Sequence, residues 1–439
     1  MADAVSLEDF PRDAKELEDY VAALFQASGH FVETQVIQRD GGAEVLEADV
    51  LATSYAGDGP EVVLGEAKSG RWGYGDIFKV YGWMTHLRVP RGGFFVQRGS
   101  RHDEETLRRK TEEMGIAFVN FGDFSEAAAR FQMAGFPAVA DPFLVEVFRF
   151  VNWAERRLVD GLRQKTKSEP HLKGPAAAYE YHQLVNDGVF IHRDVRRRLR
   201  SLCAAYQEHP RVTSGIASEM AGGEYDPDEA AADNRLMREA LYEGKHPVLQ
   251  SALYVEHRAR LALLKAGVDY RCLREAGALP PLLVNGVDLG KRVMALLPDS
   301  FRLGLEELAK GANYRRYPLL WQQFLLGFGG FFLLGYEDTE FRWLERVSGV
   351  PAAEVPHALR AFDLLFPLRD GKEWFATPGP TRCRLVKLLP AAIRGLGAFH
   401  RLARYDAARK RGEPAPDPSS DYTGRDMNAW IGAAIALLQ

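Results

Sequence analysis

The pattern of apolar and polar residues changes character near residue 140. Before that point, apolar residues follow helical spacing in some segments and short strand-like runs in others. After it, the strand-like runs nearly disappear and helical spacing dominates. Helices repeat apolar residues every three to four positions, whereas half-buried strands alternate them. The sequence therefore predicts a mixed α/β domain over 1–135, followed by a mainly α-helical region.

The first domain is expected to follow the order α-β-β-β-α-β-α-β. Leu17, Val21 and Leu24 lie on one stripe of a helix that ends at Gly29, and Asp103 is placed to cap a later helix. The expected elements are a helix over 11–29, strands over 30–38, 44–54 and 61–68, a helix over 75–87, a strand over 92–97, a helix over 103–115 and a strand over 116–121. Three consecutive strands followed by helical crossovers imply a mixed sheet covered by helices.

The region after this domain is expected to be an array of helices. A long helix begins at Asp141-Pro142, a capping residue followed by a proline at the first helical position. Further helical patterns occur at 193–207, 228–243, 247–266 and 289–312. Polar segments rich in Pro or Gly, predicted as linkers or loops, occur at 163–178, 221–234 and 410–424. The expected domains are 1–135, 136–312, 313–380 and 381–439, the last made of helices.

Composition narrows the class of protein. A chain of 439 residues is too long for one ordinary core, so two to four domains are expected. The formal net charge of −4 excludes a polycation, so contacts to nucleic acid must come from local basic patches. The cysteines, Cys203, Cys272 and Cys383, lie far apart, which argues against a zinc knuckle or disulfide framework. With no apolar leader at the start, we expect a cytoplasmic location.

One apolar segment, residues 317–336, invites a membrane interpretation. It contains Gln322, Gln323 and four glycines, and it barely reaches the length that spans a bilayer. We therefore expect a pair of buried helices and no membrane partner.

The strands around residues 45–70 carry the candidate chemistry. Alternation places Glu66 and Lys68 on one face of their strand, and Asp49 lies on the adjacent strand of the hairpin. Two neighbouring carboxylates repel each other unless a cation lies between them, and hard oxygen ligands favour Mg²⁺. A lysine beside them suits phosphate chemistry, because its ammonium polarises water or stabilises phosphoryl charge. Lys79 on the following helix is a further candidate for the same site.

This arrangement resembles the PD-(D/E)xK, or restriction endonuclease-like, nuclease superfamily over roughly residues 10–120. Asp49 matches the first acidic position, and Glu66-Ala67-Lys68 matches the ExK tripeptide on the third strand. The first helix is similar to that of the Mrr-like branch, where Glu18 takes the place of a helix glutamate, with Asp19 as the alternative by one residue. Glu47-Ala48 stands where the family often has a proline. The resemblance implies an α-β-β-β-α-β core, with Glu18, Asp49, Glu66 and Lys68 catalytic and Asp49 and Glu66 holding the metal.

The plain alternative is a surface salt bridge between Glu66 and Lys68 on a solvated edge strand. The tripeptide alone is weak, since Glu243-Gly244-Lys245 has the same pattern elsewhere in the chain. What strengthens the interpretation is the whole order of helix glutamate, hairpin aspartate, apolar strand, ExK and helix.

Residues 313–380 look like a winged helix-turn-helix, with 353–366 as the recognition helix and a wing near Asp370-Gly371. An alternative is a winged helix used for protein contacts or dimerisation. The residues predicted to contact nucleic acid are Arg196, Arg197, Arg200, Arg360, Arg369 and Lys372.

Together these patterns predict a nuclease that uses Mg²⁺, or Mn²⁺ in its place, to hydrolyse DNA, as an endonuclease. The helical region would recognise DNA, bind a partner protein or form a homo-oligomer. A role in restriction or phage defence rests on family analogy. The alternatives are a non-catalytic nucleic-acid-binding or scaffold subunit that retains the nuclease fold, and a helical signalling protein with a vestigial first domain.

Overall fold

The structure, a computed structural model, describes part of the chain in detail. The described residues are 15–40, 43–97, 103–122, 124–139, 141–190, 194–208, 247–327, 331–333, 335–365, 383–385, 405 and 407–415. They belong to two compact units, one within Leu7–Trp153 and the other within Ala154–Gln439. Each unit is described by itself below.

The first unit follows the predicted order of elements and adds two helices. Its elements are α1 (Glu16–Ala27), β1 (Phe31–Asp40), β2 (Ala43–Ser54), β3 (Glu61–Lys68), α2 (Tyr74–Leu87), β4 (Arg91–Val96), α3 (Glu104–Glu113), β5 (Ile116–Asn120), α4 (Ala127–Met133) and α5 (Pro142–Ser168), of which α5 continues into the second unit. Two predicted signals are confirmed. Gly29 ends α1 with a φ of +85°, and the Asp103 carboxylate caps α3 by accepting a hydrogen bond from the Thr106 backbone N–H at 2.8 Å.

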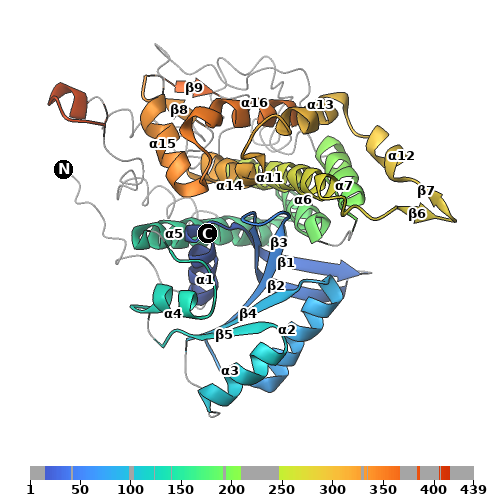
Figure 1. The fold of residues 1–439 in the computed structure, drawn as a ribbon, viewed down its shortest axis with the longest axis vertical. Helices are drawn as coiled ribbons and strands as arrows, with labels where there is room; N and C mark the ends of the chain where they lie inside the picture. The colour runs from blue at the N-terminus through green and yellow to red at the C-terminus, as the bar shows by residue number, and fades with distance from the viewer. Residues whose placement is uncertain are drawn as a thin grey trace. The chain divides into compact units, whose positions relative to one another are not determined.

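The five strands form one mixed sheet in the order β1-β2-β3-β4-β5. β1, β2 and β3 pair antiparallel, whereas β3, β4 and β5 pair parallel. Crossovers through α2 and α3 join the parallel strands. Because such crossovers are right-handed, both helices lie on the same face of the sheet. Figure 1 shows these two helices on one side of the sheet and α1 and α4 on the other. β3, which carries Glu66 and Lys68, is therefore a central strand and not the solvated edge strand of the plain alternative.

Helices pack on both faces of the sheet. On the side of α1, the rings of Phe25, Phe95 and Phe131 pack together with Phe25–Phe95 centroids 5.7 Å apart. On the side of α2, a Cβ atom at Gly92 would lie 2.5 Å from the Met84 sulfur, so the glycine lets the helix approach the strand closely. These two layers hold β3 between packed helices and make the environment of its side chains largely apolar.

The first part of α5 packs on α1, and this explains why the first unit extends past the predicted boundary at residue 135. The Arg149 guanidinium forms an ion pair with Glu16 at 2.8 Å. The Asn152 amide donates hydrogen bonds to the Gln26 side chain at 3.0 Å and to the Asp19 backbone carbonyl at 3.3 Å. These buried contacts fix α1, which carries Glu18, against the helix that follows the sheet.

The second unit is mainly helical, as predicted, and its described residues add two short pairs of strands, β6 with β7 and β8 with β9. Its remaining elements are α6 (Lys173–Phe190), α7 (Val195–Glu208), α11 (Pro247–Glu275), β6 (Leu283–Val284), β7 (Val287–Asp288), α12 (Gly290–Ala295), α13 (Asp299–Leu308), η2 (Tyr314–Arg316), α14 (Tyr317–Gln322), η3 (Gln323–Gly327), β8 (Phe331–Leu333), α15 (Glu337–Ser348), η4 (Ala352–Glu354), α16 (Val355–Leu365) and β9 (Cys383–Leu385). The long helix α11 contacts α6, α7, α13, α14 and α16, so the core of this unit is built around it (Figure 1).

Two predicted segments of this unit are corrected. The stretch 163–178, predicted as a linker or exposed loop, is the end of α5, a short turn over 169–172 that contains Pro170, and the start of α6. Its lysines and alanines favour helix on both sides of the turn. The stretch 289–312, predicted as one helix, is divided into α12 and α13 at Pro298, since proline cannot donate the backbone hydrogen bond that an unbroken helix needs. The predicted helix 228–243 and linker 221–234 lie outside the described residues.

The apolar segment 317–336 is not a pair of helices. It forms α14, a π-helical turn over Gln323–Gly327 and the strand β8, and β8 pairs antiparallel with β9. Among the described residues, no helix has both the length and the apolar character needed to cross a bilayer. The segment 381–439 was predicted to consist of helices. Its described residues include the strand β9 as well as a helical turn over 407–410. The predicted wing near residue 370 lies outside the described residues.

Candidate active site

Strand register brings the two predicted carboxylates to the same position of the sheet. Val50 pairs with Gly65 in the antiparallel ladder between β2 and β3. The next residues outward along this register are Asp49 and Glu66, which face each other across the two strands and point to one side. The Asp49 Oδ2 atom also accepts a hydrogen bond from the Ala67 backbone N–H at 2.8 Å. The hairpin therefore places both carboxylates at one end of β3, as predicted.

The Asp49 carboxyl lies in an environment that disfavours its charge. Burial raises its pKa well above the ordinary value, and the negative charges of Glu66 and Glu18 raise it further. The hydrogen bond from Ala67 and the positive charge of Lys68 act in the opposite direction but do not compensate. Asp49 thus interacts electrostatically with both of the other predicted acidic residues, Glu66 and Glu18, which indicates that the three carboxylates lie close to one another.

Two ammonium groups reach the same oxygen of Glu66. The Glu66 side chain is only 2% exposed, and its Oε1 atom lies 2.6 Å from the Lys68 Nζ atom and 3.5 Å from the Lys79 Nζ atom. Lys68 comes from β3 itself, and Lys79 comes from α2, where its ammonium also lies over the Trp83 ring at 4.0 Å from the centroid. The other carboxylate oxygen, Oε2, is buried and accepts no hydrogen bond from the described residues. Glu66 therefore retains an oxygen able to accept a further ligand.

Lys68 keeps its charge in this setting. Burial lowers its pKa, but the hydrogen bond to Glu66 and the negative charges of Glu66, Asp49 and Asp76 outweigh burial, and the pKa is raised above its ordinary value. Its ammonium is therefore a stable cation at neutral pH. Such a group donates hydrogen bonds and stabilises negative charge, but it does not act as a general base.

The first helix brings Glu18 to the site. Its carboxylate is partly exposed and lies 3.3 Å from the Lys15 ammonium. Its charge reaches Asp49, whereas the neighbouring Asp19 is buried in α1 with its backbone carbonyl bonded to Asn152. Glu18 and Asp19 were the two candidates for the acidic residue of the first helix, and Glu18 is the one whose charge raises the pKa of Asp49.

The donor set fits a hard divalent cation that keeps part of its water shell. Among the described residues, no group of three or more His, Cys, Asp or Glu side chains forms a metal-binding cluster. Mg²⁺ is bound by one or two carboxylates together with waters and substrate oxygens, so Asp49 and Glu66 are enough protein ligands for it. Such an ion would bind the Glu66 oxygen that accepts no hydrogen bond, and it would offset the charge repulsion that raises the pKa of Asp49.

The arginines predicted to contact nucleic acid lie in different environments. Arg196 is buried, and its guanidinium is bonded to Asp194 and to the Pro280 carbonyl, so it serves an internal contact. Arg197 and Arg200, on the same helix α7, are exposed. Of the described arginines predicted on α7, Arg197 and Arg200 are the ones with the exposed side chains that contact with a phosphate would need. Arg369 and Lys372 lie outside the described residues.

The predicted recognition helix, α16, packs against its own unit through one face. Val355, Ala358 and Phe362 of α16 are buried, and a Cβ atom at Gly304 of α13 would lie 2.5 Å from the Leu365 backbone nitrogen, so the two helices pack very closely. Arg360 is 71% exposed but lies 3.6 Å from Glu307 of α13. α16 therefore packs one face against its own unit and leaves Pro356 and Arg360 exposed on the other.

The chain matches no family model, no curated protein and no solved structure. Its function is therefore inferred from the geometry and chemistry of the site itself.

Proposed function

We propose that the chain is a metal-dependent nuclease that hydrolyses phosphodiester bonds of DNA. The observation that carries the proposal is the meeting of Asp49 and Glu66 across two neighbouring strands, with the Lys68 ammonium 2.6 Å from the second carboxylate. Placing two acidic groups together in a largely buried position is costly, and it is typical of sites built to hold a cation.

Each residue has a distinct role in this proposal. Asp49 and Glu66 hold Mg²⁺, for which Mn²⁺ can substitute, and Glu18 supports the site from α1. The bound ion supplies a coordinated water of lowered pKa and neutralises charge on the phosphoryl group. The Lys68 ammonium donates a hydrogen bond to the attacking water or to a phosphoryl oxygen, where it stabilises the charge that develops in the transition state. Lys79, the second amine at Glu66, is placed to contact the phosphate of the substrate.

Further parts of the proposal depend on the resemblance to PD-(D/E)xK nucleases alone. These are the endonucleolytic mode, the choice of DNA as substrate and a role in restriction or phage defence. Self-association, or binding of a partner protein, through the helical region belongs to the same group of expectations.

A second candidate function is a non-catalytic nucleic-acid-binding or scaffold subunit that retains this fold. The observation in its favour is that Glu66 Oε1 is already paired with both Lys68 and Lys79, which neutralises this carboxylate without a metal ion. Buried ion pairs of this kind also occur for structural reasons alone.

One cleavage assay separates the two candidates. Supercoiled plasmid and linear duplex DNA are incubated with the full chain and Mg²⁺ or Mn²⁺, and the same is done with Asp49→Ala, Lys68→Ala and the control Glu126→Ala. Glu126 is a matched control because it is an exposed acidic residue in an ordinary surface ion pair with Arg130. We expect metal-dependent nicking or linearisation that falls at least about 100-fold in the two site variants and is unchanged in the control.

Cleavage that persists in both site variants would show that these residues are not the active site. DNA binding without cleavage in either metal would support the scaffold function instead.

A further inference from the structure

A short β-hairpin of the second unit displays apolar side chains to solvent. β6 and β7 are joined by Asn285-Gly286, whose φ values of +51° and +78° are those of a tight hairpin turn. Leu283, Val284 and Val287 are 58%, 38% and 51% exposed. Large apolar residues clustered at the tip of a projecting element are unfavourable in water unless the element binds something.

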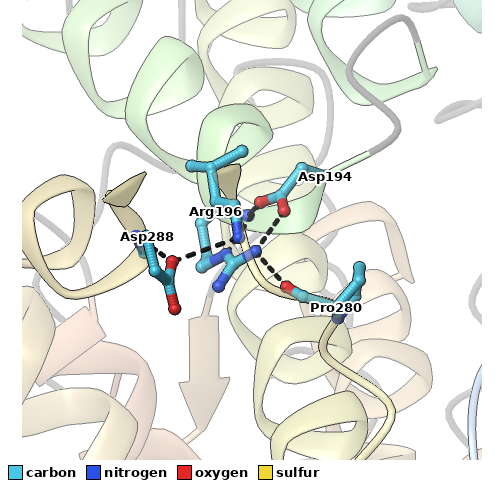
Figure 2. Close-up of polar contacts among 6 residues, drawn as sticks. Asp194, Arg196, Pro280 and Asp288 are labelled. Carbon is cyan, nitrogen blue, oxygen red and sulfur yellow. Dashed lines mark hydrogen bonds and ion pairs between the residues drawn. The ribbon is translucent and has the colours of Figure 1, made fainter. Parts of the chain in front are cut away.

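The base of this hairpin is held firmly in place (Figure 2). The Arg196 guanidinium donates to the Asp194 carboxylate, with Nε–Oδ1 at 2.9 Å, and to the Pro280 carbonyl at 2.6 Å. On the other side, the Asp288 carboxylate accepts hydrogen bonds from two backbone N–H groups that flank the hairpin, those of Leu282 at 3.1 Å and Gly290 at 2.8 Å. A two-stranded ribbon this short is marginal by itself, so these contacts are what order it.

Gly290 explains how the hairpin base meets α7. A Cβ atom at this position would collide with the Arg196 guanidinium, so only glycine allows the contact. The start of α12 therefore lies against the start of α7, and the two helices contact each other. Arg197 on α7 and Lys291 on α12 directly follow the two residues of this contact, so their backbones lie at the foot of the hairpin.

The foot of the hairpin carries exposed positive charge. Four cationic side chains, Arg197, Arg200, Lys291 and Arg292, are exposed, and none forms an ion pair with a carboxylate of the described residues. The nearby acidic groups are occupied, because Asp194 binds Arg196 and Asp288 binds two backbone N–H groups. An ordered apolar tip with exposed cations on the two helices at its base suits a partner that has both negative charge and an apolar or groove-like surface.

We propose that the β6–β7 hairpin is a DNA-binding prong that enters a groove of duplex DNA. A two-stranded ribbon fits a DNA groove, Leu and Val side chains can wedge against base steps, and an Asn side chain at the tip can hydrogen-bond to base edges. The four cations at the foot contact phosphates on either side. An anionic membrane has a similar charge, but hairpins that insert into membranes carry aromatic residues at the interface, and no Trp, Tyr or Phe occurs between Arg271 and Ser300. The inference depends on the proposed function only for the choice of DNA as ligand.

The test measures DNA binding apart from cleavage. The parent is full-length protein carrying Asp49→Ala, in buffer with a chelator, and its affinity for a fluorescent 20-base-pair duplex is measured by anisotropy at several salt concentrations. A foot variant, Lys291→Ala/Arg292→Ala, is matched by Arg109→Ala/Lys110→Ala, an exposed cationic pair on α3. A tip variant, Leu283→Ser/Val287→Ser, is matched by Leu303→Ser, an exposed leucine on α13.

The two variants should weaken binding in different ways. Loss of the two foot cations is expected to lower affinity about tenfold and to reduce the slope of log K against log salt by about one per cation removed. Loss of the tip side chains is expected to lower affinity several-fold without changing that slope, because the contact is apolar. The matched controls should bind like the parent, and all variants should keep the thermal midpoint of the parent because the altered residues are exposed.

The proposal is overturned if both hairpin variants bind DNA like the parent, or if the parent itself shows no duplex binding. It is also overturned if the hairpin variants leave DNA binding intact but lose sedimentation with vesicles of phosphatidylserine and phosphatidylcholine. A failure of the nuclease proposal would give a different result. The unmodified chain would then bind DNA through the hairpin without cutting it.

Discussion

The Asp49 carboxylate accepts a hydrogen bond from the backbone N–H of Ala67, the residue between Glu66 and Lys68. The first acidic group of the site is thereby tied to the same tripeptide that supplies the second acidic group and the amine. This short link between β2 and β3 holds the charged groups together even though repulsion raises the pKa of Asp49. The site thus stores an unfavourable electrostatic interaction inside a rigid hairpin, and several measurable consequences follow.

Replacement of Asp49 by asparagine should stabilise the metal-free protein. A carboxyl whose pKa is raised on folding contributes stability that is complete below its unfolded pKa and is lost as the pH rises through its folded pKa. At pH 7, Asp49→Asn removes this penalty and retains an oxygen for the Ala67 N–H, so we expect a gain of about 1 kcal/mol in the free energy of unfolding. Urea denaturation at pH 7 and at pH 4 measures it, and the gain should shrink at the lower pH. A loss of stability at pH 7 would contradict the description of Asp49 as a strained group.

Removal of Lys68 should separate metal binding from cleavage. Lys68→Met removes the ammonium that lies 2.6 Å from Glu66 Oε1, and with it a positive charge, so Mn²⁺ should bind several-fold more tightly. DNA cleavage should fall about 100-fold or more, because the ammonium no longer stabilises charge in the transition state. Isothermal titration with Mn²⁺ measures the first effect, and the plasmid assay measures the second. Lys110→Met, at an exposed lysine on α3, serves as the control. Weaker Mn²⁺ binding in Lys68→Met would mean that Glu66 is not a metal ligand.

His30 should make the first unit less stable in acid. Its pKa is lowered to about 4, chiefly by burial and to a smaller extent by the charge of Arg91, although the backbone hydrogen bond at Phe25 acts in the opposite direction. Between pH 6.5 and 4 the unfolded chain binds a proton that the folded chain does not, so stability falls as the pH falls through this window, by about 3 kcal/mol for this residue. His30→Gln should lose less stability between pH 7 and pH 4.5 in urea denaturation. Equal losses in both proteins would show that His30 does not set this dependence.

Arg196 and its neighbour Arg197 should behave oppositely on truncation. Arg196→Ala removes the partner of Asp194 and of the Pro280 carbonyl in a buried position, so it should cost about 2–3 kcal/mol in the free energy of unfolding. Arg197→Ala should change stability by less than about 0.5 kcal/mol, because its side chain is exposed. Chemical denaturation of the two variants side by side makes the comparison. Equal destabilisation would mean that the anchoring of the hairpin does not depend on Arg196.

Alanine at two helical glycines should have opposite effects. Gly304→Ala places a Cβ atom 2.5 Å from the Leu365 backbone nitrogen and forces α13 away from α16, so it should destabilise the second unit by about 1–3 kcal/mol. Gly82→Ala in α2 meets nothing within 4 Å and should stabilise the first unit by about 0.5–1 kcal/mol, because glycine has the greater entropy in the unfolded chain. Calorimetric unfolding reports both changes. A neutral Gly304→Ala would indicate that the two helices can separate without cost.

The amino-acid sequence by itself determined the order of elements in the first unit and predicted which charged residues of β2 and β3 come together. Periodicity is a local property, and it correctly placed α1, the three consecutive strands, the later helices and the caps at Gly29 and Asp103. Alternation along β3 also put Glu66 and Lys68 on one face. These predictions succeeded because each depends on neighbouring residues only.

Tertiary structure alone decided what depends on distant partners. The central place of β3, the ion pair of Lys79 with Glu66 and the burial of Arg196 arise from elements far apart in the chain. The basic run at α7 is divided into buried and exposed arginines by the position of the β6–β7 hairpin, which no local pattern reveals. Burial and charge pairing are long-range properties, because they depend on which segments pack together, and for that reason only the folded chain shows them.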